Sequence, residues 1–350
     1  MEVLSRHQLA KTWEDPKRLI ELADYLSLFL FGLFNPVVRT MRGLCAASKW
    51  ERVQRDICTR PISLGSFSEC QALVDPQLLR ELMKELLVHN AQQQDGRLPK
   101  ELLGVDSTVW VVLPRMHWAN WSPQVGQERA IRLHLKFNLL ERQPKDALMT
   151  VARQCERKTL RGWIKPGEFY VGDCYYGEEY SLLGRLDRQG CGFVTRLREQ
   201  AVWTVLEEIL VSTADHQVGV FWQAWVRLGQ EGKGPRVRVI KVRGQDEEIW
   251  LVTNQPAEQL SAELIWQIYR YRWQVELYFR WIKCILGCRH WLAESQPGVA
   301  LQLYLALIAA QVLLLITGQR PTRRQMEALQ AYTLGWISDQ ELSQSIIKRA

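Results

Sequence analysis

The chain has 350 residues, of which 47% are hydrophobic and 24% are charged. This composition, with no low-complexity tract, excludes a disordered protein and is enough for a large core in one long domain or in two to three shorter ones. Lys and Arg outnumber Asp and Glu by 45 to 38, and the net charge of +7 favours a polyanionic partner such as nucleic acid, although many basic proteins bind none.

Residues 1–95 are predicted to be helical. The chain begins with charges of both signs and lacks the apolar segment of a signal peptide. The clearest helix starts at Pro76, with Asp75 as its N-cap. The polar segment 90–99 then interrupts the helical pattern, which predicts a domain boundary.

Residues 96–200 have the pattern of β-strands. Strands are expected at 102–113, 129–140, 169–175 and 192–197, with a short helix at 178–188. Strands that alternate with helices predict an α/β layer.

Three further regions are predicted after residue 200. They are a β-rich region at 201–255, one long helix from Ala257 to Leu286 within 256–295, and C-terminal helices at 298–316 and 322–348 within 296–350. The stretch 299–316 is long enough to span a membrane, but Gln302 and Gln311 favour a helix buried in a globular domain. We therefore expect no membrane anchor.

Eight cysteines are scattered without the regularity of a disulfide scaffold. Cys284, Cys288 and His290 lie close together in the sequence, but a fourth zinc ligand is missing there. Buried reduced thiols are the better interpretation. They predict a reducing, cytoplasmic compartment.

Two aspartates lie in apolar strands, Asp106 in the first and Asp173 in the third. An ionised carboxylate in a buried strand is costly unless it is paired or holds a cation. Two of them in adjacent strands suit a divalent metal with oxygen ligands. For either aspartate alone, a salt bridge or a solvated strand end is the more usual explanation.

The predicted long helix carries a stripe of polar residues: Tyr269, Arg272, Glu276 and Lys283. At about 100° per residue, their side chains fall within an arc of about 60°. A carboxylate beside two cations and a phenol suits a metal next to phosphate oxygens. The alternative is an i,i+4 ion pair between Arg272 and Glu276, which would leave the other two residues unexplained.

The spacing of these four residues resembles the Tyr–Arg–Glu–Lys signature of DDE transposases from bacterial insertion sequences, the family numbered four. Asp106-Ser-Thr, Gly172-Asp-Cys-Tyr-Tyr and Phe193-Val-Thr-Arg-Leu resemble its other motifs, in the family's order. The likeness runs from about residue 100 to 290. It implies a ribonuclease-H-like α/β core, interrupted by a β-rich insertion at 201–255, with helical N- and C-terminal regions.

The resemblance also implies an enzyme of cut-and-paste DNA transposition. Asp106, Asp173 and Glu276 would be its catalytic residues and the ligands of Mg²⁺, with Mn²⁺ as a substitute. Cleavage would leave a 3′-hydroxyl that attacks DNA again to join the strands.

Four residues are expected to contact DNA. Arg272 and Lys283 would bind phosphates, and the Tyr269 hydroxyl would donate to the same strand. Trp250 would stack on an extruded base, as in relatives that form hairpins, although core packing is the more usual role for such a residue.

The expected partners are double-stranded DNA with terminal inverted repeats, target DNA and a second copy of the chain in a synaptic complex. Residues 1–95 would recognise the repeat, and the enzyme would work on the bacterial nucleoid. Three alternatives stay open: an inactive or domesticated DNA-binding relative, a protein anchored in a membrane through 299–316, and a nuclease that does not join strands.

Overall fold

The computed structural model describes residues 20–86, 96–119, 121–122, 128–245, 247–284, 287, 291–318 and 322–346. The chain folds into two compact units. The helical unit comprises residues 1–88, 109–131 and 278–350, and the sheet unit comprises residues 89–108 and 132–277.

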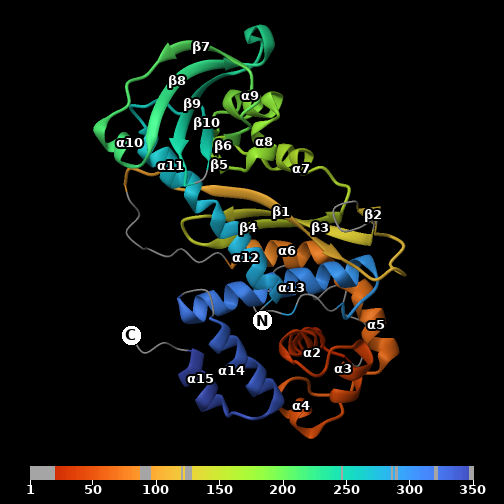
Figure 1. Cartoon of the computed structure of the whole chain (residues 1–350). Helices are drawn as coiled ribbons and strands as arrows, with labels where there is room; N and C mark the ends of the chain where they lie inside the picture. Colours follow the sequence, from red (N-terminus) through yellow and green to blue (C-terminus); the bar gives the residue numbers. More distant parts are fainter. Residues whose placement is uncertain are drawn as a thin grey trace. The chain divides into compact units, whose positions relative to one another are not determined.

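The helical unit is built around a long apolar helix (Figure 1). Its helices are α2 (Leu22–Phe34), α3 (Met41–Ala47), α4 (Glu51–Asp56), α5 (Leu64–Leu73), α6 (Pro76–Glu85), α13 (Gln296–Thr317), α14 (Arg323–Leu334) and α15 (Asp339–Ile346). Helix α13 packs against α2, α5 and α6. The predicted cap of α6 is confirmed, because the Asp75 side chain accepts a hydrogen bond from the Gln77 amide at 2.9 Å.

Helix α13 has the length and hydropathy of a membrane span, but 78% of its most apolar segment is buried within the protein. Gln302 and Gln311 are each 1% exposed, and the Gln302 side chain accepts a hydrogen bond from the Leu292 amide at 2.9 Å. These are the features of a core helix, as the two glutamines predicted. The single helix expected at 322–348 is wrong, because Gly335 ends α14 in the left-handed conformation at φ +83°.

The sheet unit is an α/β layer. Its strands follow the order β3-β1-β5-β6-β10-β9-β8-β7, and β4 pairs with β3. They are β1 (Leu103–Val111), β3 (Glu128–Asn138), β4 (Gln143–Val151), β5 (Phe169–Val171), β6 (Gly192–Leu197), β7 (Trp203–Glu208), β8 (Val220–Leu228), β9 (Arg236–Arg243) and β10 (Glu248–Thr253). β1 and β3 continue into the helical unit, where β2 (Trp121–Ser122) pairs with β3. β5 is parallel to both β1 and β6.

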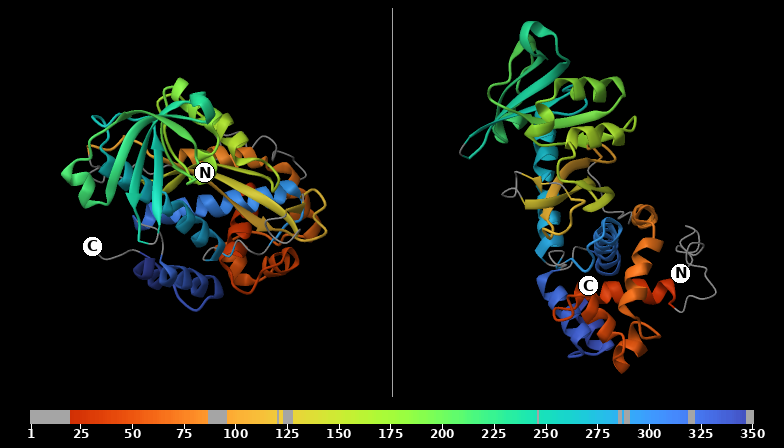
Figure 2. Two further views of the ribbon diagram at one scale, coloured as in Figure 1. Left: turned by 45° about the horizontal axis from the view of Figure 1, so that its top comes forward. Right: turned by 90° about the vertical axis from the view of Figure 1, so that its right-hand side faces the viewer.

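Helices cover both faces of this sheet (Figure 2). They are α7 (Glu156–Trp163), α8 (Cys174–Gly177), α9 (Tyr180–Arg188), α10 (Thr213–Gln217), α11 (Ala262–Tyr271) and α12 (Trp273–Cys284), which ends in the helical unit. Leu103 and Val105 pack in the core formed with α7–α9, whereas Gly104 lies against Val275 of α12. Because successive strand residues point to opposite faces, Asp106 lies on the α12 face.

The region predicted to be β-rich contains four antiparallel strands, β7 to β10. They are not a separate sheet, since β10 pairs with β6 from Trp250–Leu197 to Thr253–Val194. The expected strand at 169–175 is shorter than predicted and ends at Val171, because Asp173 caps α8 instead.

The single helix expected from Ala257 to Leu286 is also wrong. Ser261 caps α11 by accepting a hydrogen bond from the Leu264 amide, so the helix begins at Ala262. The backbone tightens at Arg272, which separates α11 from α12. The Arg272 amide donates to the Tyr269 carbonyl, and the Val275 amide donates to the Arg272 carbonyl, so both hydrogen bonds span three residues instead of four.

Candidate active site

Asp106 and Asp173 lie on neighbouring segments of the sheet unit. In the parallel pair β1–β5, Leu103 is opposite Tyr170 and Gly104 is opposite Val171. Continued past the end of β5, this register brings Asp106 level with Asp173. The two residues therefore lie near the carboxyl end of β5, where open α/β sheets usually bind ligands.

Helix α12 brings Glu276 to the same place because it packs closely on β1. A Cβ atom on Gly104 would lie 2.7 Å from Cγ2 of Val275, so only glycine permits this approach. Val275 is completely buried. Glu276 follows it directly, and Asp106 is two residues beyond Gly104.

The Asp106 carboxylate lies in the electric field of the other two carboxylates. Burial raises the pKa of Asp106 to about 7, although its carboxylate accepts a hydrogen bond from the Ser107 amide at 2.7 Å. The negative charges of Glu276, Asp173 and Glu156 raise this pKa further. A carboxylate with these neighbours is stabilised by a cation.

Glu276 is only half satisfied. Arg272 Nη1 donates to its Oε1, whereas among the described residues its buried Oε2 has no hydrogen-bond partner. The Arg272 guanidinium also lies 5.6 Å from the centre of the Tyr269 ring. Burial raises the pKa of Tyr269, and the charges of Arg272 and Arg196 oppose that rise.

The three carboxylates converge without forming a closed ligand shell. In the part of the chain that the structure describes, no three His, Cys, Asp or Glu side chains are near enough to one another to hold one ion. One oxygen of Glu276 is bound by Arg272, and one oxygen of Asp173 accepts the Tyr175 amide at 3.0 Å. The three carboxylates thus interact through their charges and are not in direct contact with one another in the described part of the chain.

Two of the residues expected to contact DNA, Lys283 and Trp250, instead contact other residues of the protein. In the helical unit, Lys283 Nζ donates to the Val109 carbonyl at 2.8 Å and lies 4.6 Å from the centre of the Trp110 ring. Trp250, on β10, packs edge-on against Trp203 at 5.1 Å, and the Lys241 ammonium lies 4.4 Å from its ring centre.

Sequence reasoning missed Arg196 as a site residue. It lies on β6, binds Glu247 through two hydrogen bonds of 3.0 and 2.7 Å, and acts electrostatically on Tyr269. Its signal was a lone cation in the otherwise neutral strand 192–197. Neither zinc binding nor burial as reduced thiols can be compared with the structure here, because the side chains of Cys284, Cys288 and His290 lie outside the described residues.

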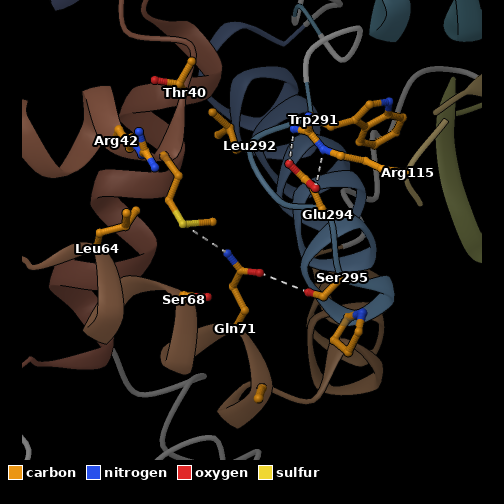
Figure 3. A pocket seen from close by; sticks show the side chains of 13 residues that line it. Thr40, Arg42, Leu64, Ser68, Gln71, Arg115, Trp291, Leu292, Glu294 and Ser295 are labelled. Carbon is orange, nitrogen blue, oxygen red and sulfur yellow. Dashed lines mark hydrogen bonds and ion pairs between the residues drawn. The ribbon is translucent and has the colours of Figure 1, made fainter. Parts of the chain in front are cut away.

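The helical unit contains a cavity of about 610 Å³ that is lined by both polar and apolar side chains (Figure 3). Arg42, Arg115, Gln71, Glu294 and Ser295 are among the residues that line it. Arg115 binds Glu294, with Nε–Oε2 at 2.6 Å, and the Ser295 hydroxyl donates to the Gln71 side chain at 3.1 Å. Its acidic group is thus paired and exposed, unlike the Asp106 carboxylate of the sheet unit.

The transposase DDE domain family matches residues 97–312, a segment that contains all three carboxylates. The chain belongs to this family. It is a transposase of the insertion-sequence kind, as the spacing of its motifs predicted.

Two proteins similar in sequence to this chain are also named as transposases. A Sinorhizobium fredii protein named as the transposase y4zB is 28% identical over 266 residues, which cover 73% of this chain and 67% of that protein. A Geobacillus stearothermophilus protein named as the transposase for insertion sequence element IS5377 is 28% identical over 243 residues, covering 65% and 62%. The chain thus spans about two thirds of the length of these relatives.

Among solved structures, the piggyBac transposase in a synaptic complex with hairpin DNA gives a TM-score of 0.49 at 9% identity, covering 100% of this chain and 83% of that one. That level of likeness identifies neither a fold nor an activity.

Transposases of the DDE family generally use a divalent metal ion. The chemistry of the residues around Asp106 suits such an ion. Asp106 is desolvated beside two other carboxylates, and Glu276 has a buried oxygen free of hydrogen-bond partners among the described residues. Oxygen donors of this kind are those that Mg²⁺ and Mn²⁺ prefer.

Proposed function

We propose that the protein catalyses cleavage and strand transfer at the ends of an insertion sequence, with Asp106, Asp173 and Glu276 as the ligands of Mg²⁺. The observation that carries the proposal is the desolvated Asp106 carboxylate, which lies in the field of two further carboxylates. Bound divalent ions supply an activated attacking oxygen and stabilise the leaving oxygen of a phosphodiester.

The arrangement of the sheet unit supports a ribonuclease-H-like core. The set β4-β3-β1 is extended by the parallel strands β5 and β6. The acidic residues lie on β1, directly after β5 and on the helix that packs against β1. In this division residues 96–200 and 256–295 form the core, and 201–255 are the β-rich insertion that extends its sheet through β10.

The cations around Glu276 fit a role in holding DNA. We propose that Arg272 exchanges Glu276 for a phosphate oxygen when DNA binds, which releases the carboxylate for its ligand role. The Tyr269 hydroxyl would donate a hydrogen bond to the same DNA strand. The positive charge of Arg196 acts on this hydroxyl. Lys283 would have to leave the Val109 carbonyl to reach a phosphate.

Trp250 has support for an aromatic role as well as for packing. Its ring is half-buried and is flanked by Trp203 and the Lys241 ammonium, a combination of aromatic and cationic groups that suits a stacked base. We retain the proposal that it receives an extruded base at the transposon end.

The proposed partners are terminal inverted repeats, target DNA and a second copy of the chain, acting on the bacterial nucleoid in the cytoplasm. Residues 1–95 would contribute to recognition of the repeat, and residues 296–350 would support that region through α13. The paired and cationic groups of the cavity in Figure 3 are compatible with contacts to a DNA backbone.

Glu276→Gln tests the proposal, with Glu263→Gln on α11 as its matched control. Cleavage of DNA that carries the element's end should be lost in Glu276→Gln and retained in Glu263→Gln, while both bind that DNA in a mobility-shift assay. Cleavage by Glu276→Gln at the wild-type rate would refute the assignment. A wild-type protein that binds the end but cuts it with neither Mg²⁺ nor Mn²⁺ would be the inactive relative.

A further inference from the structure

A buried ion pair between Arg132 on β3 and Glu156 in the first turn of α7 lies beside the acidic site. The two side chains are 8% and 18% exposed. The Arg132 guanidinium also donates through Nε to the Ala152 carbonyl at 3.1 Å. A buried pair contributes little net stability, because the cost of removing two charges from water offsets their attraction. The other contacts of the Arg132–Glu156 pair indicate a role in positioning neighbouring residues.

The first of these contacts leads to Asp106. Arg132 Nη1 donates to the Ser107 hydroxyl at 2.7 Å, and the Ser107 amide donates to Asp106 Oδ1 at 2.7 Å. Residues 106 and 107 point to opposite faces of β1, so the guanidinium acts from the α7 face on a carboxylate that faces α12. One residue therefore connects the ion pair to the first aspartate.

The second contact leads to Asp173. The Tyr176 hydroxyl donates to Glu156 Oε2 at 3.4 Å, and its ring lies over Gly172, where a Cβ atom would come within 2.9 Å of it. Tyr176 belongs to α8, which Asp173 caps through the Tyr175 amide. The ion pair thus supports the segment just before the second aspartate and the helix just after it.

We propose that Arg132 and Glu156 form a positioning pair that orients the Asp106 and Asp173 carboxylates as ligands of a divalent cation. This inference rests on the function proposed above for the two aspartates. Neither member of the pair binds the cation or DNA. Each positions an aspartate through the residue between them, and the charge of Glu156 also acts on Asp106.

Mn²⁺ binding to the full chain without DNA, measured by electron paramagnetic resonance, tests the pair. Glu156→Gln should weaken Mn²⁺ affinity by about tenfold, the effect typical of removing a residue that orients a metal ligand. Glu156→Asp, which keeps the charge, should recover part of the loss. Asp106→Asn should abolish the same binding, and this variant tests the proposed function itself.

The matched control is a second buried ion pair on the same strand. Lys136 Nζ lies 2.7 Å from Glu168 Oε2, and the two side chains are 3% and 10% exposed. Glu168→Gln also removes the carboxylate partner of a buried cation, but it should keep the wild-type Mn²⁺ affinity, because Lys136 and Glu168 contact Tyr170 in β5 rather than Ser107 or Tyr176. Equal losses in Glu156→Gln and Glu168→Gln would overturn the inference, as would unchanged affinity in Glu156→Gln.

Ser107→Ala keeps the test decisive if Glu156→Gln fails to fold. It cuts only the connection to Asp106, so a smaller loss of Mn²⁺ affinity is expected with a melting temperature near that of the wild type. Wild-type affinity in Ser107→Ala would then overturn the inference. Wild-type affinity in Asp106→Asn would overturn the proposed metal site and the positioning pair with it.

Discussion

The cavity of the helical unit and the acidic site of the sheet unit differ in how their carboxylates are partnered. In the cavity of the helical unit, Glu294 is about half exposed and binds Arg115 with both oxygens. In the sheet unit, Asp106 is desolvated beside Glu276 and Asp173, and one oxygen of Glu276 is left without a hydrogen bond among the described residues. A charge that is paired locally supports structure or recognition, whereas a carboxylate that is buried without a full set of partners is typical of a functional site.

Asp106→Asn and Glu294→Gln should show the largest difference between the two regions. We expect Asp106→Asn to reduce metal-dependent cleavage at least about 10³-fold. The same variant should melt at a higher temperature than the wild type in metal-free buffer, because it removes the cost of a desolvated charge.

Glu294→Gln should keep cleavage and cost less than about 1 kcal/mol of stability, since exposed ion pairs contribute little. Cleavage rates with Mg²⁺ and thermal melts in a chelator measure both effects. An Asp106→Asn protein that melts below the wild type would show that this carboxylate is satisfied after all.

Gly104→Val should have the next largest effect, because it attacks the geometry of the acidic site rather than its charge. The first added carbon would lie 2.7 Å from Val275 Cγ2 and 2.9 Å from a Leu139 methyl group. We expect a loss of about 1–3 kcal/mol of stability, as for other overpacked cores, together with a loss of cleavage as α12 moves off β1.

Gly162→Ala on α7 is the control, since an added Cβ there meets no atom within 4 Å. Urea unfolding and cleavage assays on both variants measure the difference. Normal cleavage by a folded Gly104→Val protein would show that the close approach of α12 is not needed to place Glu276.

His134 gives a smaller, pH-dependent effect, because it is a buried polar group of the sheet unit that is satisfied. Burial lowers its pKa to about 3, and its ring bonds to the Thr150 hydroxyl at 2.9 Å. A lowered pKa gives stability that is present above about pH 6.5 and is lost as the pH falls from there toward 3.

His134→Gln should therefore lose less stability than the wild type between pH 7 and pH 4, whereas His216→Gln, at an exposed position, should follow the wild type. Urea midpoints across this pH range measure the slopes. Equal slopes in all three proteins would contradict the lowered pKa of His134.

Sequence reasoning succeeded where local chemistry decides the structure. The cap at Asp75, the strands around Asp106 and Arg196, and the buried character of α13 follow from capping, periodicity and side-chain polarity. The family also followed from motif spacing, since four residues at fixed intervals are rare by chance.

What the sequence could not supply were contacts between distant segments. An ideal helix places Tyr269, Arg272, Glu276 and Lys283 on one face, but the tightened turn at Arg272 and the bond from Lys283 to Val109 depend on tertiary packing. Likewise, nothing local in residues 132 and 156 shows that they form a buried pair beside the aspartates. Periodicity in the sequence predicts which face of a helix or strand is buried, whereas the residues that each side chain contacts depend on the tertiary fold.

The smallest effect is expected for Arg42→Gln, in the cavity of the helical unit. If this cavity contacts the DNA backbone, removing one cation should weaken binding of all sequences alike and reduce the slope of log affinity against log salt concentration by at most about 1. Arg55→Gln is a matched control, because its guanidinium is exposed and already binds the carboxylate of Asp56. Fluorescence anisotropy with end-containing and unrelated duplexes at several salt concentrations measures both variants. A loss confined to the end-containing duplex would instead place Arg42 against a base edge, which would make the paired cavity a reader of sequence.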